Sequence, residues 1–220
     1  MKHLELFSGT HSFGKVSSNF GFDVISLDKD LEADCPFGTG YVSKNHIKED
    51  IMTWNYKIYP PNYFTLITAS PLCLWWSKCR FSWINRKLKV HGDKIITSEI
   101  LNEDIEKYGV PMVDKVFEIL DYFNPDYFLI ENPQTGKMKE YINDLIPFID
   151  VDYCQYGFSY QKKTRFWTNI KFKNTKCSHK IHNKDKDWNK GRITRYRIPE
   201  KLIENIIINM IKQKIELRNI

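Results

Sequence analysis

Short apolar runs alternate with segments of helical spacing along the first two-thirds of the chain. Runs of apolar, β-branched and aromatic residues that are bounded by polar or turn-forming residues predict strands. Such runs occupy His3–Phe7, Val24–Leu27, Tyr63–Ala69, Tyr127–Ile130, Tyr153–Tyr156 and Phe166–Phe172. Apolar residues three or four positions apart and helix-boundary residues predict helices. The predicted helices cover Phe13–Phe20, Val110–Phe123, Met138–Ile149 and a last segment from Glu200, which Pro199 opens.

The alternation of strands and helices indicates an α/β protein. Strands that are separated by helices form βαβ units, so we expect a doubly wound, mainly parallel sheet. Ligands in such sheets bind beyond the carboxyl ends of the strands. Polar residues follow five successive segments at those ends, namely Ser8-Gly9-Thr10, Asp28, Asp50, Ser70-Pro71-Leu72-Cys73 and Glu131-Asn132-Pro133. Their common position predicts that one site is assembled from all five segments.

The composition is that of a chain with a packed core. The 220 residues are 42% hydrophobic and 15% aromatic, which is enough for one sizeable core and a small appendage. No apolar run is long enough to cross a bilayer, and the start of the chain lacks the features of a signal peptide. The five cysteines show no paired C-x-x-C spacing, which favours reduced thiols. We therefore expect a cytoplasmic protein without a membrane partner.

Positive charge is concentrated in one part of the chain. The formal net charge is +6, and residues 162–197 hold most of the excess lysine and arginine, interleaved with aromatic residues. This combination suits a polyanion such as nucleic acid. A lysine-rich, solvated surface would give the same pattern, so charge alone does not decide between the two interpretations.

Three of the strand ends carry residues suited to a nucleotide-like ligand. A glycine in the turn at Gly9 allows the backbone to approach a ligand closely. Asp28 lies about 20 residues further on, where a carboxylate can accept hydrogen bonds from ribose hydroxyls. Asp50 could accept a hydrogen bond from an adenine amino group. Each feature also has a simpler explanation, as a tight turn, a polar strand end or a surface acid.

The other two strand ends carry a thiol and a carboxyl group. Cys73 is a candidate nucleophile because a thiolate is soft and partly available near neutral pH. Glu131, on a neighbouring strand, could donate a proton to a ring nitrogen that gains charge. The alternatives are a buried structural cysteine and a helix-capping acid.

Gln161, Lys163 and Arg165 alternate along one later segment of the chain. In an extended strand their side chains would share one face. An arginine there could hold a carbonyl or phosphate oxygen in a defined geometry. A solvated cationic strand would show the same alternation.

Cys177, His179 and His182 form a compact group of metal-ligating residue types. A closed structural zinc site requires four ligands, and the local spacing shows no fourth residue. The sequence alone therefore does not predict a metal site.

These segments, taken in order, resemble the motifs of the cytosine carbon-5 methyltransferase family, and the resemblance spans nearly the whole chain. The cofactor motifs are matched by Leu4–Gly14 (F-x-G-x-G), Ser26–Asp30 (ribose-binding motif) and Glu49–Ile51 (G-D-I). The catalytic and C-terminal motifs are matched by Ser70–Ser77 (G-S-P-P-C-Q-x-F-S), Glu131–Pro133 (E-N-V, in the E-N-P form of small phage and viral relatives), Tyr156–Arg165 (Y-G-x-P-Q-x-R-x-R) and Arg197–Leu202 (C-terminal return segment).

The resemblance implies a Rossmann-like S-adenosylmethionine-dependent methyltransferase fold and methyl transfer to carbon 5 of cytosine in DNA. Cys73 would add covalently to a flipped-out base, with Glu131 and Arg165 as the other catalytic residues. The cofactor S-adenosylmethionine would be held by Phe7, Gly9, Thr10, Asp28, Lys29, Asp50, Ile51 and Pro71. The substrate would be contacted by Ser70, Asn132, Gln161 and Lys163.

The same resemblance divides the chain into three parts. Residues 1–173 correspond to the catalytic core, and residues 174–197 correspond to a very small, basic target-recognition insert. Residues 198–220 correspond to a C-terminal helix that packs back on the core. Because the insert is short, we expect low sequence specificity, or specificity that a partner subunit or a homodimer supplies.

Three positions depart from the family motifs, and two alternative functions stay open. The second glycine of the first motif is replaced near His11-Ser12, Leu72 stands in place of a proline, and Lys163 stands in place of an arginine. These changes would also suit a catalytically weak, nucleic-acid-binding accessory subunit with the same fold. Methylation of cytosine in tRNA is the other alternative, because phosphate contacts look alike for both polymers.

Overall fold

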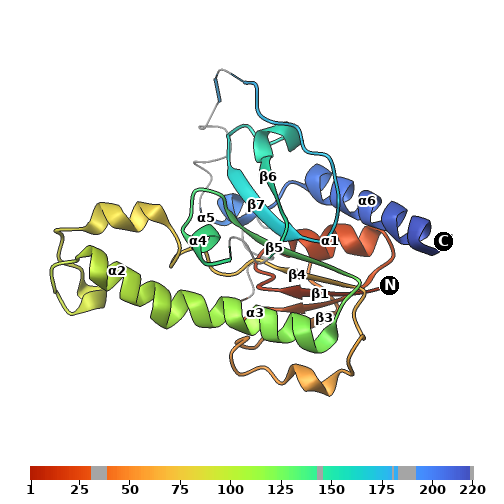
Figure 1. Cartoon of the computed structure of the whole chain (residues 1–220), viewed down its shortest axis with the longest axis horizontal. Helices are drawn as coiled ribbons and strands as arrows, with labels where there is room; N and C mark the ends of the chain where they lie inside the picture. Colours follow the sequence, from red (N-terminus) through yellow and green to blue (C-terminus); the bar gives the residue numbers. More distant parts are fainter. Residues whose placement is uncertain (31–38, 143–145, 180, 183–191, 219–220) are drawn as a thin grey trace.

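The computed structural model describes residues 1–30, 39–142, 146–179, 181–182 and 192–218, and Figure 1 shows helices packed around one sheet. Within the described residues, the sheet has the strand order β3-β2-β1-β4-β5-β7-β6. The strands are β1 (Lys2–Leu6), β2 (Asp23–Leu27), β3 (Asn45–Ile47), β4 (Leu66–Ala69), β5 (Tyr127–Pro133), β6 (Phe148–Asp152) and β7 (Lys163–Thr168). Strands β1 to β5 pair in parallel, and β7 runs antiparallel to both β5 and β6. The predicted mainly parallel sheet is confirmed.

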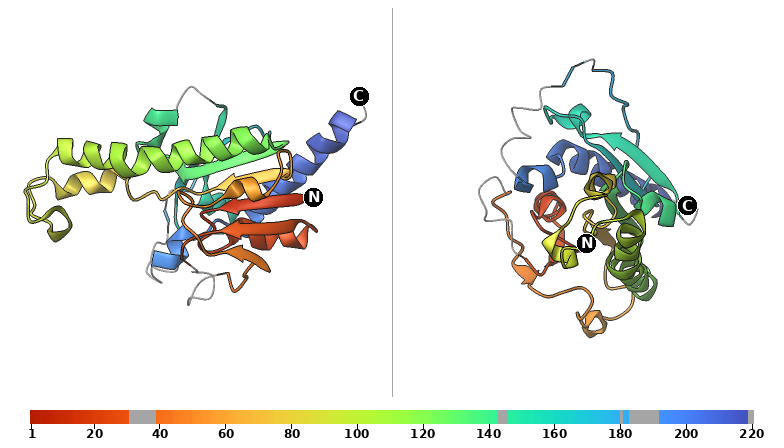
Figure 2. Two further views of the ribbon diagram at one scale, coloured as in Figure 1. Left: turned by 90° about the horizontal axis from the view of Figure 1, so that it is seen from below. Right: turned by 90° about the vertical axis from the view of Figure 1, so that its left-hand side faces the viewer.

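Helices cover both faces of the sheet, as Figure 2 shows. Helices α1 (Ser12–Asn19) and α6 (Glu200–Arg218) pack together on one face, and α3 (Val110–Phe123) covers the other. Neighbouring residues of β5 alternate between the two apolar cores, because successive strand side chains point to opposite faces. Leu129 belongs to the core beneath α6, and Ile130 belongs to the core beneath α3.

The remaining short helices lie mostly in the connections. They are η1 (Tyr56–Ile58), α4 (Met138–Ile142), η5 (Tyr153–Tyr156) and α5 (Arg192–Tyr196). Among the residues that the structure describes, none of the helices has the length and apolar character needed to cross a bilayer.

A helical projection, defined here as residues 74–109, extends away from the sheet (Figure 1). It contains η2 (Lys78–Trp83), η3 (Lys89–His91), α2 (Ser98–Asp104) and the π-helical turn η4 (Ile105–Gly109), which continues into α3. A buried ion pair between Arg80 and Asp104 joins its two sides. The sequence did not predict this projection, because polar residues interrupt the helical spacing before Val110.

The predicted boundaries are wrong in the region that follows α4. Residues Tyr153–Tyr156 form the 3-10 helix η5, which ends at Gly157 with φ of 99°, and not a strand. The strand β6 lies just before it, so the predicted helix over Met138–Ile149 does not reach Ile149. Helix α4 covers Met138–Ile142, and residues 143–145 lie outside the described residues. Asp150 and Asp152 interrupt the apolar residues of β6, so the sequence does not look like a strand there. Asp150 forms an ion pair with Arg165 of β7. Strand β7 likewise starts earlier than predicted and ends at Thr168 instead of Phe172.

Candidate active site

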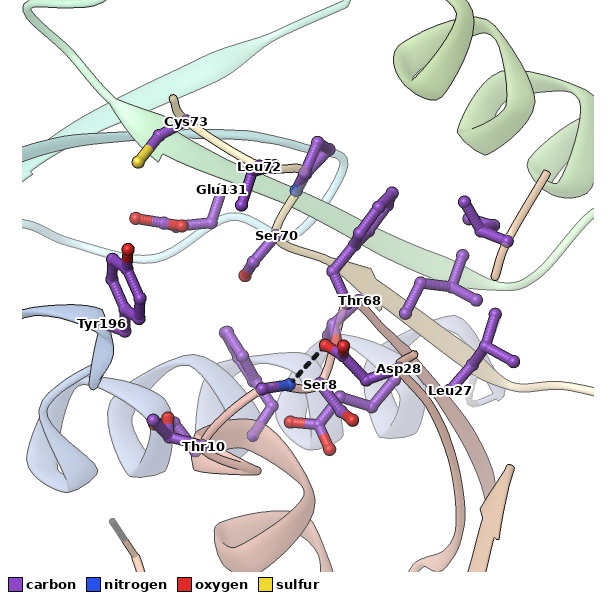
Figure 3. A pocket seen from close by; sticks show the side chains of 18 of the residues that line it. Ser8, Thr10, Leu27, Asp28, Thr68, Ser70, Leu72, Cys73, Glu131 and Tyr196 are labelled. Atoms are coloured by element: carbon purple, nitrogen blue, oxygen red, sulfur yellow. Dashed lines mark hydrogen bonds between the residues drawn. The ribbon is translucent and has the colours of Figure 1, made fainter. Parts of the chain in front are cut away.

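A cavity of about 340 Å³ opens at the carboxyl ends of the parallel strands (Figure 3). Its volume lies in the range of small-molecule sites, roughly 300–1,000 Å³. Every one of the five polar strand-end segments contributes to its wall, through Ser8, Gly9, Thr10, Asp28, Asp50, Ser70, Pro71, Leu72, Cys73, Glu131 and Pro133. The five segments therefore meet at one site, as their positions in the sequence predict.

The loop after β1 has an unusual backbone that brings it to the cavity. Phe7, Gly9 and His11 have φ values of 55°, 43° and 53°, in the left-handed region that favours glycine. The Gly9 N–H donates a hydrogen bond of 2.8 Å to Asp28 Oδ2, which links this loop to the end of β2. Burial raises the pKa of Asp28, and the hydrogen bonds from the Asp30 and Gly9 N–H groups oppose that rise.

A buried carboxylate supports this loop from below. Glu5 accepts hydrogen bonds from the Gly14 N–H at Oε1 (2.9 Å) and from the Ser26 hydroxyl at Oε2 (3.0 Å), and His11 Nδ1 lies 3.5 Å from Oε2. Burial raises the pKa of Glu5, but the contacts with His11, His3 and Gly14 outweigh it, so the pKa is lowered. His11 thus occupies a position where the family motif has glycine, and it combines a left-handed backbone with an imidazole ring beside Glu5.

We expect Gly14→Ala to lower the stability of the protein by about 1–3 kcal/mol. A Cβ atom at position 14 would lie 2.5 Å from Glu5 Oε2, and moving this buried carboxylate breaks its hydrogen bonds. Thermal unfolding of Gly14→Ala, Glu5→Ala and the double variant measures the coupling, with Asn19→Ala on the exposed end of the same helix as control. Additive losses in the double variant would contradict the proposed steric conflict.

Cys73 and Glu131 face the same cavity from the ends of neighbouring strands, and Figure 3 shows the thiol and carboxyl groups side by side. The Cys73 side chain is partly buried, and Glu131 is buried. Burial raises the pKa of the Cys73 thiol above its ordinary value, and the nearby Glu131 raises it further. Lys162 lowers it, so the cation partly offsets the two other effects.

Two side chains that the sequence did not indicate hold Glu131. The Tyr153 hydroxyl donates a hydrogen bond of 3.2 Å to Glu131 Oε1, and Lys162 Nζ lies 3.9 Å from the same oxygen. Tyr153 is fully buried, and burial, followed by the charge of Glu131, raises its pKa well above the ordinary value. Tyr153 therefore stays a hydrogen-bond donor and fixes the position of this carboxylate.

The loop that carries Cys73 is fastened on both sides. Asn132 Nδ2 donates a hydrogen bond of 2.8 Å to the carbonyl oxygen of Pro71, just before Leu72. After Cys73, the Trp76 ring packs on Gly109, where an added Cβ would lie 3.0 Å from the ring. Asn132 thus lies behind the cavity wall and positions the loop, which compensates for the proline missing at position 72.

The structure does not bring Arg165, Lys163 or Gln161 to the cavity wall. Arg165 pairs in register with Asn132, so its side chain lies on the opposite face of the sheet from Glu131. Its guanidinium binds both carboxylate oxygens of Asp150, at 2.7 and 2.8 Å. Lys163 is exposed, and Gln161 donates a hydrogen bond to Asp152.

Met112, Lys162 and Tyr196 are among the cavity-lining residues that were not predicted as site residues. The family motif suggested Lys163, whereas Lys162 is the residue before it. This difference of one residue places Lys162 on the same face of the sheet as Glu131. Tyr196 comes from α5, and its hydroxyl points across the cavity toward Glu131 (Figure 3). Met112 comes from the first turn of α3, a segment for which the sequence predicted a helix but no part in the site.

Two features define a Rossmann-like S-adenosylmethionine-dependent methyltransferase fold. One is the strand order, in which β7 lies antiparallel between β5 and β6, and the other is the glycine loop after β1 with the acid after β2. The chain is also 38% identical over 173 residues to the Frog virus 3 (isolate Goorha) protein named "Probable DNA (cytosine-5)-methyltransferase". The match covers 77% of this chain and 71% of that protein. The chain therefore belongs to the DNA cytosine-5 methyltransferase family, and the resemblance of its motifs to that family is confirmed.

The chain also matches solved methyltransferase structures. The match to the S. pombe Dnmt2 methyltransferase has 17% identity and a TM-score of 0.46, and it covers 80% of this chain and 50% of that chain. The match to the Entamoeba histolytica methyltransferase EhMeth has 18% identity and a TM-score of 0.48, with coverages of 83% and 57%. This chain thus spans about half the length of those structures. No family model matches the chain.

The residues at the first loop fit a nucleoside-containing cofactor. The Ser8 hydroxyl is buried at the cavity wall and has no hydrogen-bond partner among the described residues. The Asp28 carboxylate and the Gly9 turn lie beside it, and apolar Ile51 lines the same cavity. A ligand with ribose hydroxyls and a flat apolar ring matches this set of donors, acceptors and apolar surface.

Proposed function

We propose that this protein transfers a methyl group from S-adenosylmethionine to carbon 5 of cytosine in DNA. The name of the Frog virus 3 relative supports both the reaction and the polymer. The observation that carries the proposal is the common cavity of Cys73 and Glu131, because covalent activation of a pyrimidine ring needs a nucleophile and a proton donor at the same base.

The cofactor would occupy the part of the cavity beside the first loop. Asp28 accepts hydrogen bonds from the ribose hydroxyls, Asp50 accepts one from the adenine amino group, and Ile51 contacts the ring. When bound, S-adenosylmethionine supplies an electrophilic methyl group. The remaining contacts in this proposal come from the cavity residues Phe7, Gly9, Thr10, Lys29 and Pro71.

The base would react in the part of the cavity beside Cys73. The Cys73 thiolate adds to carbon 6 of a flipped-out cytosine, and Glu131 donates a proton to N3, which makes carbon 5 electron-rich. Carbon 5 would then take the methyl group as the bond from that methyl to the cofactor sulfonium breaks, and the sulfur would leave as a neutral thioether. A base removes the carbon-5 proton, the 5,6 double bond re-forms, the Cys73–carbon 6 bond breaks, and N3 returns its proton to Glu131. The enzyme is thereby restored with its thiolate and carboxylic acid.

Other predicted site residues have supporting roles in this proposal. Ser70 contacts the substrate at the cavity wall, and Asn132 positions the nucleophile loop through the Pro71 carbonyl. Arg165 is a positioning residue that ties β7 to β6 through Asp150. Lys162, at the cavity wall, supplies a cation 3.9 Å from Glu131 Oε1.

Residues 174–197 are proposed to contact the nucleic-acid backbone beside this cavity. Tyr196 at the end of this segment lines the cavity wall, and Arg195 and Arg197 flank it. Residues 180 and 183–191 of the segment lie outside the described residues. Residues 1–173 form the catalytic core in this scheme, and the C-terminal part, through α6, packs on α1 of that core. A partner subunit or homodimer would then have to supply any strong sequence specificity.

Labelled methyl incorporation tests the function directly. The full chain is incubated with methyl-labelled S-adenosylmethionine and, separately, with duplex DNA, single-stranded DNA and tRNA, and the products are digested to nucleosides. We expect 5-methylcytosine from DNA. Label in tRNA alone would support the proposed chemistry but show that the substrate is tRNA and not DNA. N4- or N6-methylated nucleosides would contradict a thiol mechanism. Binding of the cofactor without any transfer would favour the accessory-subunit alternative.

The rate of methyl transfer is expected to rise with pH through the raised pKa of Cys73, because the thiolate is the reactive form. Lys162 lowers that pKa, so Lys162→Met should move the rising limb of the kcat/KM profile to higher pH. At neutral pH the variant should be several-fold slower, and its rate should approach the wild-type rate at alkaline pH.

Lys162→Arg is the matched control for this profile, since it keeps the positive charge. A profile of Lys162→Met that is lowered equally at every pH would mean that Lys162 acts by some route other than the thiol. A wild-type rate that is constant from pH 6 to the alkaline limit would contradict the raised pKa.

A further inference from the structure

Four metal-ligating side chains converge outside the active-site cavity: Cys154, Cys177, His179 and His182. Cys154 comes from η5, and the other three come from the chain after β7. One candidate ligand atom from each side chain lies within 4.8 Å of every other. None of the four has a role in the proposed reaction.

Two distances within this group are close to those of a tetrahedral site. Cys177 Sγ lies 3.5 Å from His179 Nδ1 and 3.2 Å from His182 Nε2. Zinc bonds of about 2.3 Å to sulfur and 2.0–2.1 Å to nitrogen give tetrahedral ligand–ligand distances of roughly 3.3–3.8 Å. We propose that Cys154, Cys177, His179 and His182 form a structural Zn²⁺ site.

Polar groups around the four side chains orient them. The Cys177 N–H donates a hydrogen bond of 3.1 Å to Asp152 Oδ2 at the end of β6, and Gln161 Nε2 donates one of 3.0 Å to the other oxygen. Gln155 Nε2 lies 3.9 Å from Cys154 Sγ, where it can donate a hydrogen bond to a thiolate. Such outer contacts fix ligand side chains in metal sites. Gln161 therefore has a place in this cluster, through Asp152.

The donor set selects the metal. Two thiolates and two imidazoles without a carboxylate disfavour Mg²⁺ and Ca²⁺, which prefer oxygen ligands, and a tetrahedral S₂N₂ set suits Zn²⁺. Four protein ligands leave no open coordination position, which is typical of structural and not catalytic zinc. Zinc binding would deprotonate both thiols and bring the two otherwise separate pieces of chain together.

The site would fasten the start of the basic segment 174–197 to the edge of the sheet. Cys177, His179 and His182 all lie in that segment, and Cys154 directly follows β6. Metal binding would therefore order a segment that is too short to build a core of its own. Presentation of this segment to nucleic acid would be a further consequence, and it rests on the proposed function. The metal site itself does not rest on that function.

Metal analysis of the untagged full chain tests the site. Protein purified under reducing conditions in zinc-containing medium is expected to hold one zinc ion per chain by mass spectrometry of the metals. Cys177→Ser and His179→Ala should lose nearly all of it, and His179 is exposed, so its removal should leave the core folded. Cys79→Ser and His91→Ala, a cysteine and a histidine in the helical projection, should keep it.

Cobalt substitution supplies an independent readout. Co²⁺ in this site should show the visible absorption bands of tetrahedral, thiolate-bound cobalt, and Cys177→Ser should lose them. Removal of zinc by a chelator should expose residues 173–197 to trypsin while the core resists. Zinc content that is unchanged in both ligand variants, absence of zinc after reconstitution, or a Cys154–Cys177 disulfide under the same conditions would overturn the proposal. Methyl transfer is not used as a readout, so failure of the proposed function would leave this test intact.

Discussion

Cys73→Ala is expected to lower the rate of methyl transfer by at least about 10³-fold, because no other nucleophile replaces a covalent step. Cys73 lines the cavity beside Glu131, and alanine removes the sulfur without introducing a polar group or extra volume. Cofactor binding should stay nearly unchanged, since the first loop and Asp28 are untouched. Single-turnover transfer of labelled methyl groups measures the rate, and calorimetry with S-adenosylmethionine measures binding.

Cys79→Ser is the matched control for Cys73→Ala. Cys79 is an exposed free cysteine six positions further along the same part of the chain. The Cys79→Ser variant should transfer methyl groups at the wild-type rate. Normal transfer by Cys73→Ala would show that the nucleophile has been assigned wrongly. Loss of cofactor binding by that variant would point to collapse of the cavity and not to loss of the chemical step.

Glu131→Gln is expected to slow methyl transfer by about 10²–10⁴-fold, the usual contribution of a positioned general acid. Glutamine has nearly the same shape and can still accept the hydrogen bond from Tyr153, but it has no acidic proton to transfer. The defect should therefore appear in kcat, and the melting temperature should stay close to that of the wild type.

Glu140→Gln, an exposed change of the same type in α4, should leave the rate unaltered. Tyr153→Phe separates positioning from proton transfer, because it removes the hydrogen bond that holds the Glu131 carboxyl group but leaves that group in place. We expect a smaller loss of rate for Tyr153→Phe than for Glu131→Gln. Equal rates for Glu131→Gln and the wild type would remove Glu131 from the mechanism.

Much of the site could be predicted from the sequence because it is built at strand ends. The apolar runs at β1, β2, β4 and β5 fix where the strands stop, and in a parallel sheet all those ends meet at one edge. Cys73 and Glu131 could therefore be expected to face one another from positions far apart in the chain. The residues proposed to bind the cofactor follow the same rule.

The residues that contact Glu131 could not be predicted in the same way. A shift of one residue in a strand moves every side chain to the other face. Lys162, just before β7, lies beside Glu131, whereas Arg165 lies on the opposite face of the sheet. Only the pairing of Asn132 with Arg165 reveals this difference. Tyr153 was also missed, because the turn after β6 was interpreted as a strand.

The sequence by itself determined the class of sheet, the family and the edge at which the cavity forms, since these follow from hydrophobic periodicity and local motifs. The tertiary structure alone decided which face each side chain of β7 occupies, and it joined Cys154 to Cys177, His179 and His182. The physical reason is the distance along the sequence between the residues that interact. Periodicity reports how one segment folds, whereas strand register and a four-ligand cluster depend on contacts between segments that the sequence separates.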